Sequence, residues 1–210
     1  MERKNLKYTL EFWFEFGSPY SYLSIMRIEA LEARYGVTSV WKPFLLGPLF
    51  TKFGWKTSPF NIYPIKGKYM WRDMERRSKR HGIDFQNPTL SDDFDFPQNG
   101  VAAARLAILG LQNEWGRIFC KSVFKHQFAD GLPIADFEVV ARIAVDAGAS
   151  ERQIQQAVSP ENKLKLRSNT ELAAAHEIFG APSVKVNGEL FWGDDRLEDA
   201  FEFLVQEQRR

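Results

Sequence analysis

Apolar positions at the start of the chain change from strand spacing to helix spacing and back. Residues 8–16 are rich in aromatic and β-branched side chains, which favours a strand. From Ser18 to Gly36 the apolar residues recur at helical spacing, with Ser18 as the expected cap and a proline in the first turn. Residues 37–44 predict a second strand, parallel to the first, so the chain opens as a βαβ unit.

The middle of the chain is mostly helical in its spacing. Residues 45–67 are rich in glycine and proline, and we expect an irregular loop there, with another loop at 84–97. Helical patterns follow one another at about 68–80, 99–112, 114–128, 136–147, 150–157 and 159–179.

The end of the chain predicts a hairpin followed by a helix. Residues 183–186 and 189–192 have strand composition and are joined by Asn-Gly, a strong hairpin signal. A terminal helix is expected at about 195–208. The order βαβ, helices, ββα predicts an α/β, thioredoxin-like fold with a large α-helical insertion. We expect the thioredoxin-like domain to comprise residues 1–50 and 178–210, and the insertion 51–177.

Composition narrows the classes of function. The net charge of +1 gives no general attraction to nucleic acid or to an anionic membrane. No apolar stretch has the length of a signal peptide core or a membrane span. Cys120 is the only cysteine, and the three histidines are scattered, so neither a disulfide nor a metal site is expected. We expect a cytoplasmic protein without membrane or nucleic-acid partners.

The segment Ser18-Pro19-Tyr20-Ser21 lies where the first strand meets the first helix. Free backbone N–H groups and the helix dipole favour an anion at such a point, and a thiolate is one. Ser18 could therefore donate a hydrogen bond to a bound thiolate. An ordinary N-cap is the alternative interpretation.

Two later segments have similar alternatives. Pro182, after Gly180-Ala181, could follow a cis peptide bond that turns its neighbour toward a ligand, or could simply enter the strand in trans. Asp194 and Asp195 could either cap the terminal helix or pair with the ammonium group of an amino-acid ligand.

Several motifs together, in this order, resemble one family. The chain is similar to the 2-hydroxychromene-2-carboxylate isomerases, relatives of kappa-class glutathione transferases and DsbA-type oxidoreductases, over nearly its whole length. The motifs are Phe16-Gly17-Ser18-Pro19-Tyr20-Ser21, Ser58-Pro59-Phe60-Asn61 with Pro64, Lys66, Tyr69 and Asp73, Phe96-Pro97-Gln98-Asn99-Gly100, Phe179-Gly180-Ala181-Pro182, and Phe191 to Asp199.

The resemblance implies bound glutathione and a homodimer. By it, Ser18 contacts the glutathione sulfur, and the backbone of Ala181 beside Pro182 pairs with the cysteinyl part. Asp194 and Asp195 match the stretch that holds the γ-glutamyl end. Asn61 and Lys66 match loop positions that reach the active site, although the spacer between them is shorter than in kappa-class transferases.

The implied reaction interconverts 2-hydroxychromene-2-carboxylate and trans-o-hydroxybenzylidenepyruvate in aromatic hydrocarbon catabolism, so the substrate is a small aromatic carboxylate. A glutathione transferase and a non-catalytic glutathione- or peptide-binding module are the alternatives. A thiol–disulfide oxidoreductase is disfavoured because serines replace both cysteines of the redox motif.

Two further predictions concern side chains around the site. Tyr20, Phe16, Phe53 and Trp55 are candidates for an aromatic wall, with core packing as the alternative for each. The basic residues of the predicted helix 68–80 are interpreted as a solvated face that could also steer acidic ligands; they are Arg72, Arg76, Arg77, Lys79 and Arg80.

Overall fold

The computed structural model describes residues 9–91 and 94–209 and contains one four-stranded sheet. The strands are β1 (Leu10–Phe14), β2 (Ser39–Pro43), β3 (Ser183–Val186) and β4 (Glu189–Trp192), in the order β2-β1-β3-β4. β1 is parallel to β2 and antiparallel to β3, and β3 is antiparallel to β4. This is the predicted thioredoxin-like arrangement, although residue 8 of the predicted first strand lies outside the described residues.

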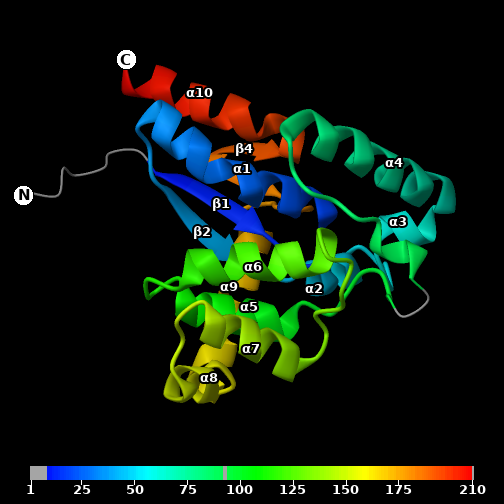
Figure 1. Cartoon of the computed structure of the whole chain (residues 1–210). Helices are drawn as coiled ribbons and strands as arrows, with labels where there is room; N and C mark the ends of the chain where they lie inside the picture. The colour runs from blue at the N-terminus through cyan, green and yellow to red at the C-terminus, as the bar shows by residue number, and fades with distance from the viewer. Residues whose placement is uncertain (1–8, 92–93, 210) are drawn as a thin grey trace, which may run out of the picture.

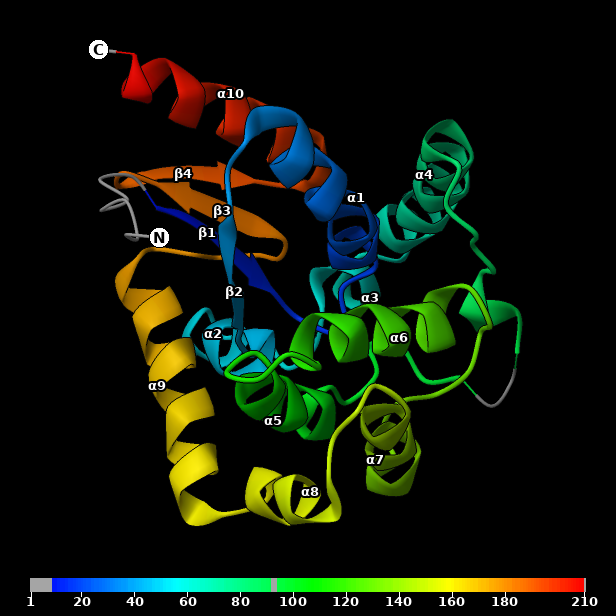
Figure 2. The same cartoon turned by 60° about the vertical axis from the view of Figure 1, so that its left-hand side comes forward.

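Helices cover the sheet on both sides (Figures 1 and 2). α1 (Pro19–Tyr35) and the C-terminal α10 (Leu197–Gln208) pack together on one face, and α9 (Pro160–Ala175) lies against β2 on the other. α1 begins directly beyond the carboxyl end of β1, so the sheet fixes where its N-terminus lies.

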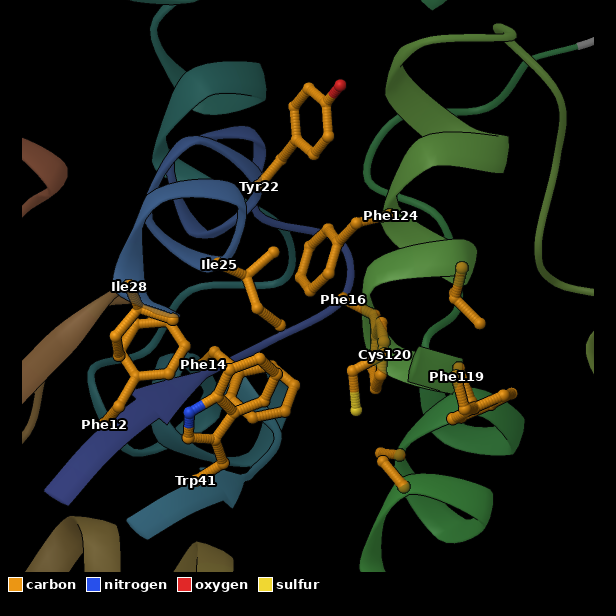
Figure 3. Close-up of a cluster of buried hydrophobic side chains, with 14 of the residues drawn as sticks. Phe12, Phe14, Phe16, Tyr22, Ile25, Ile28, Trp41, Phe119, Cys120 and Phe124 are labelled. Atoms are coloured by element: carbon orange, nitrogen blue, oxygen red, sulfur yellow. The ribbon is translucent and has the colours of Figure 1, made fainter. Parts of the chain in front are cut away.

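Side chains of β1 alternate between the two faces of the sheet and so belong to two separate clusters of buried side chains. Phe12 and Phe14 belong to the large cluster that includes Trp41 of β2 and Phe124 (Figure 3). Trp13, between them, points to the opposite face and packs with a smaller set beside α9. Because both faces of β1 are buried, the strand holds the start of α1 in a rigid frame.

Cys120 lies inside the large cluster, fully buried (Figure 3). Burial raises the pKa of its thiol well above the ordinary value. The thiol is therefore part of the core rather than of the surface.

The helical middle largely follows the predicted pattern. The four helices are α5 (Val101–Gly110), α6 (Gly116–Phe128), α7 (Phe137–Asp146) and α8 (Glu151–Ala157). Ser150 and Gln153 form a reciprocal capping box at the start of α8. The division into two domains remains a prediction.

The prediction of an irregular loop at 45–67 was wrong. This segment contains α2 (Leu46–Lys52), α3 (Pro59–Ile62) and the start of α4 (Pro64–His81). Pro59 and Pro64 stand at first helical positions, where the missing N–H costs nothing, so these prolines begin helices instead of breaking them. The loop at 84–97 likewise contains a short 3₁₀ turn at Pro88–Leu90.

The predicted end of α9 was also inaccurate, whereas α10 (Leu197–Gln208) ends at the predicted residue. α9 ends at Ala175, four residues early, and Glu177 follows with a positive φ of 58°. A 3₁₀ turn at Asp194–Arg196 precedes α10. Within the described part of the chain, no helix combines the length and apolarity needed to cross a bilayer.

Candidate active site

A cavity of about 970 Å³ opens where β1 ends and α1 begins. It brings together segments that are distant in sequence: the turn before α1, the α2–α4 region, the loop before α5, and the segment around Pro182. Polar and charged side chains on its walls include Glu15, Ser18, Lys66, Asp73, Arg77 and Asp195.

Ser18 uses its hydroxyl twice at the edge of this cavity. The oxygen accepts a hydrogen bond from the Ser21 N–H at 3.2 Å, which confirms the predicted N-cap. The hydroxyl also donates to the carbonyl oxygen of Ala181 at 2.8 Å. The cap is therefore joined directly to the second predicted segment, 163 residues later.

The Ala181–Pro182 peptide bond is cis, which is one of the two alternatives that the sequence left open. The carbonyl of Pro182 accepts a hydrogen bond from the Gly193 N–H at 3.0 Å. This bond ties the segment to the turn that carries Asp194 and Asp195. The Phe96–Pro97 bond is also cis, and both of these residues line the cavity.

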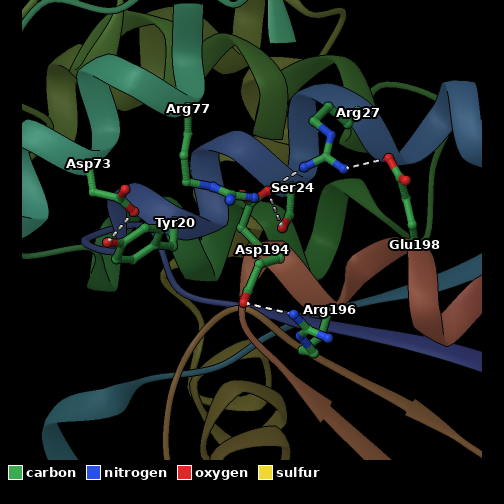
Figure 4. A network of polar contacts seen from close by, with 9 residues as sticks. Tyr20, Ser24, Arg27, Asp73, Arg77, Asp194, Arg196 and Glu198 are labelled. Carbon is green, nitrogen blue, oxygen red and sulfur yellow. Dashed lines mark hydrogen bonds and ion pairs between the residues drawn. The ribbon is translucent and has the colours of Figure 1, made fainter. Parts of the chain in front are cut away.

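Asp194 is fully buried and accepts hydrogen bonds from three side chains (Figure 4). Arg27 donates to one carboxylate oxygen at 2.7 Å, and Ser24 donates to the same oxygen at 3.4 Å. Arg77 donates through Nε to the other oxygen at 2.6 Å. Both carboxylate oxygens are therefore engaged within the protein.

Asp195 lies beside it but behaves differently. Its side chain is 56% exposed and pairs with Arg196 at 3.2 Å. Neither aspartate side chain caps the 3₁₀ turn or α10, so the capping alternative was wrong for both. Asp195 is the carboxylate of this pair that a cationic group in the cavity could reach.

The prediction that the basic residues of this helix face solvent was wrong for Arg77. Its side chain is 19% exposed and turns inward to Asp194, whereas that of Arg72 is 66% exposed. Arg77 continues the helical spacing of the buried Met70 and Met74, so it lies on the same face of α4. This spacing could have shown from the sequence that Arg77 points inward. On the same helix, Asp73 accepts a hydrogen bond from the Tyr20 hydroxyl at 3.1 Å.

The two predicted loop residues have different positions. Lys66 lines the cavity, with Nζ 5.6 Å from the centre of the Phe60 ring. Asn61 is not among the lining residues. Its side-chain amide donates to the carbonyl of Phe96 at 2.7 Å and to Thr57 Oγ1 at 3.2 Å. Asn61 thus holds the loop that carries Phe96 against α3.

The aromatic wall is built mostly from residues that were not predicted. Of the four candidates only Tyr20 lines the cavity; Phe16 is buried in the core, and Phe53 and Trp55 pack on each other outside it. The aromatic lining residues are Tyr20, Phe50, Phe60, Tyr69, Phe96, Phe179 and Trp192. Two of them, Phe50 and Phe60, belong to helices in the segment 45–67 that was predicted to be a loop.

Glu15 is a further residue that sequence reasoning missed. It lies on the cavity wall between the end of β1 and Ser18, and its carbonyl accepts a hydrogen bond from the Ser18 N–H at 3.1 Å. Burial raises the pKa of its carboxyl to about 7, with a smaller opposing effect from a hydrogen bond with the Gly17 backbone. Nothing in the sequence indicated that Glu15 is buried, because the alternation of side chains in the predicted strand 8–16 does not show which of them line a cavity.

Within residues 9–91 and 94–209, no three His, Cys, Asp or Glu residues gather closely enough to hold a metal ion.

The family model of the DSBA-like thioredoxin domain matches residues 9–205, which include the residues of this site. The chain belongs to the DSBA-like thioredoxin family. A Sphingobium xenophagum 2-hydroxychromene-2-carboxylate isomerase is 25% identical over 199 residues, covering 94% of this chain and 98% of its own. Glutathione S-transferase kappa 2 of Caenorhabditis elegans is 26% identical over 211 residues, covering 94% and 92%.

Solved structures agree on the DSBA-like fold. A 2-hydroxychromene-2-carboxylate isomerase superimposes with a TM-score of 0.80 at 23% identity, covering 96% of this chain and 98% of that one. A probable DsbA oxidoreductase from Streptomyces coelicolor superimposes with a TM-score of 0.76 at 19% identity, covering 97% and 91%. The curated relatives are thus isomerases and glutathione transferases, and the resemblance inferred from the motifs is confirmed at the level of the family.

Proposed function

We propose that the protein binds glutathione with its sulfur at Ser18 and catalyses the isomerisation of 2-hydroxychromene-2-carboxylate to trans-o-hydroxybenzylidenepyruvate. The observation that carries the proposal is the Ser18 hydroxyl, which caps α1 and reaches the Ala181 carbonyl at the edge of a large, partly aromatic cavity. The relatives named as isomerases and as kappa glutathione transferases support the same ligand and reaction class.

The residues at this point fit a tripeptide thiol. A hydroxyl at a helix N-terminus stabilises negative charge on sulfur, because it donates a hydrogen bond where the helix dipole is positive. If Ser18 turned its hydrogen toward a thiolate, the Ala181 carbonyl would be released to accept an amide N–H. Asp195 is an exposed carboxylate within the same cavity and suits an ammonium group.

Bound glutathione would supply a thiolate that adds reversibly to the conjugated carbon, so that rotation about a single bond becomes possible. The part of this chain is to hold that charge at Ser18 and to orient the substrate carboxylate. Lys66 and Lys56 are the cations on the wall suited to that second task. Asn61 acts indirectly in this proposal, by holding the loop at Phe96.

Calorimetry and a thiol balance test the proposal. We expect reduced glutathione to bind the wild-type protein, and the isomer ratio of the substrate to change without loss of free thiol. Absence of binding would refute the proposal.

A glutathione transferase is the second candidate, because the kappa-class relatives are as similar as the isomerases. Stoichiometric loss of free thiol with an electrophile would identify it. We also propose that the protein is a cytoplasmic homodimer. Analytical ultracentrifugation of the purified protein tests whether it is a dimer.

A further inference from the structure

The carboxylate of Glu15 is held in a narrow place between two glycines. A Cβ atom built on Gly17 would lie 3.0 Å from one Glu15 oxygen, and a Cβ built on Gly100 would lie 3.0 Å from the other. A side chain at either position would press on the carboxylate and displace it. Gly17 and Gly100 both line the cavity, as Glu15 does.

The backbone of Glu15 is tied to the same turn as Ser18. Its carbonyl accepts from the Ser18 N–H, and its N–H donates to the Ser21 hydroxyl at 3.5 Å. The carboxylate is thus carried on the rigid end of β1, three residues before the proposed thiolate site.

No ion pair of the described residues neutralises Glu15. The turn at Gly17 and the start of α5 at Gly100 present backbone to it, and the only favourable contact that offsets its burial is the one with Gly17. The charged groups that share the cavity are Lys56, Lys66, Asp73, Arg77, Asp95, Asp194 and Asp195. Of these, Asp73, Arg77, Asp194 and Asp195 have partners of their own.

We propose that Glu15 is the proton acceptor for the thiol bound at Ser18, an inference that rests on the proposed function. Glu15 receives the proton as the S–H bond breaks, while the electron pair stays on sulfur. It gives this proton to the substrate oxygen on which negative charge develops and takes it back during elimination. Protons and electrons balance over the cycle, and no oxidant or reductant is required.

Both protonation states of Glu15 are accessible near neutral pH, because burial places the pKa of its carboxyl at about 7. A group of this kind suits a step that needs a base first and an acid afterwards. Ser18 cannot fill that role, because its hydroxyl donates a hydrogen bond, to Ala181 in this structure and to the thiolate in the proposed complex, and takes up no proton near neutral pH.

Glu15→Gln tests the inference, because glutamine keeps the shape and cannot accept the proton. Reduced glutathione is titrated calorimetrically at about pH 8, where the carboxylate is mostly ionised, in two buffers of different ionisation enthalpy. For the wild type we expect thiolate absorbance in the near ultraviolet with little proton release to the buffer. For Glu15→Gln we expect either release of close to one proton or loss of that absorbance, and a fall in turnover of about 10².

Glu11→Gln is the matched control. Glu11 lies in β1, the strand that directly precedes Glu15, and it bonds to Trp13 outside the cavity, so this variant should behave as the wild type does. If Glu15→Gln shows wild-type absorbance and proton release, the inference is wrong while glutathione binding stands. If the wild type itself does not bind glutathione, the proposed function fails and this inference fails with it.

Discussion

The hydroxyl of Ser18 donates to the carbonyl oxygen of Ala181 at 2.8 Å, and this bond joins the start of α1 to the segment before β3. The same oxygen accepts the Ser21 N–H, so one side chain both caps a helix and closes the cavity edge. These two tasks can be separated experimentally, because the cap affects stability and the donor hydrogen affects ligand binding.

Ser18→Ala is expected to lower the free energy of unfolding by about 1 kcal/mol, the usual effect of losing an N-cap. It is also expected to reduce glutathione-dependent turnover about 10²-fold, because one donor to developing negative charge is removed. Chemical denaturation and steady-state kinetics measure the two effects.

Ser150→Ala is the control for Ser18→Ala. Ser150 caps α8, far from the cavity in the helical region, and accepts the Gln153 N–H in the same way. The two variants should lose similar stability, and only Ser18→Ala should lose turnover. Equal turnover in the two variants would leave Ser18 with a capping role alone.

Local signals in the sequence predicted the parts of the site that local geometry determines. Asn187-Gly188 forms the expected hairpin turn, with positive φ at both residues. The Ser18-Pro19 pair starts α1 as expected. In both cases the conformation is determined by a few adjacent residues, so it can be predicted from the local sequence.

Contacts over long sequence separations were not predictable in this way. Arg77 meets Asp194 across 117 residues, and nothing in either neighbourhood specifies the other. Helices α2 and α3 and the start of α4 were also missed, because the prolines of α3 and α4 occupy helix starts, where they do not disrupt hydrogen bonding. The aromatic lining went unrecognised because its residues come from segments far apart in the sequence, which only the fold brings together.

Asp194→Asn is expected to destabilise the protein by about 3 kcal/mol, because it leaves two partly buried guanidinium groups, Arg27 and Arg77, without their shared negative partner. Thermal or urea unfolding measures this loss. Asp199→Asn provides the comparison, since Asp199 pairs with Arg196 on the surface, where both side chains are about half exposed. That variant should lose less than about 1 kcal/mol. Similar losses in the two variants would contradict the structural role of Asp194.

Glu15 should make stability depend on pH in a defined direction. Its pKa is raised from 4.5 to about 7, so between these values the folded chain holds a proton that the unfolded chain has released. The stabilisation is fully present below about pH 4.5 and is lost as the pH rises through about 7.

Glu15→Gln lacks this titration. Relative to the wild type it should gain about 3 kcal/mol of stability between pH 4.5 and pH 8, as follows from the raised pKa. Unfolding curves across that range measure the difference, and Glu11→Gln should follow the wild-type curve. A constant difference between Glu15→Gln and the wild type would show that the Glu15 carboxyl titrates normally.

Cys120 should be unreactive in the folded protein. Its side chain is fully buried in the main core cluster, and burial raises the pKa of the thiol, so neither access nor thiolate is available. We expect a chromogenic aromatic disulfide to react with it at least about 10²-fold more slowly in buffer than in denaturant. Cys120→Ser should retain glutathione-dependent turnover, and neither protein should reduce insulin. Insulin reduction that disappears in Cys120→Ser would instead indicate a disulfide exchange activity that depends on this thiol.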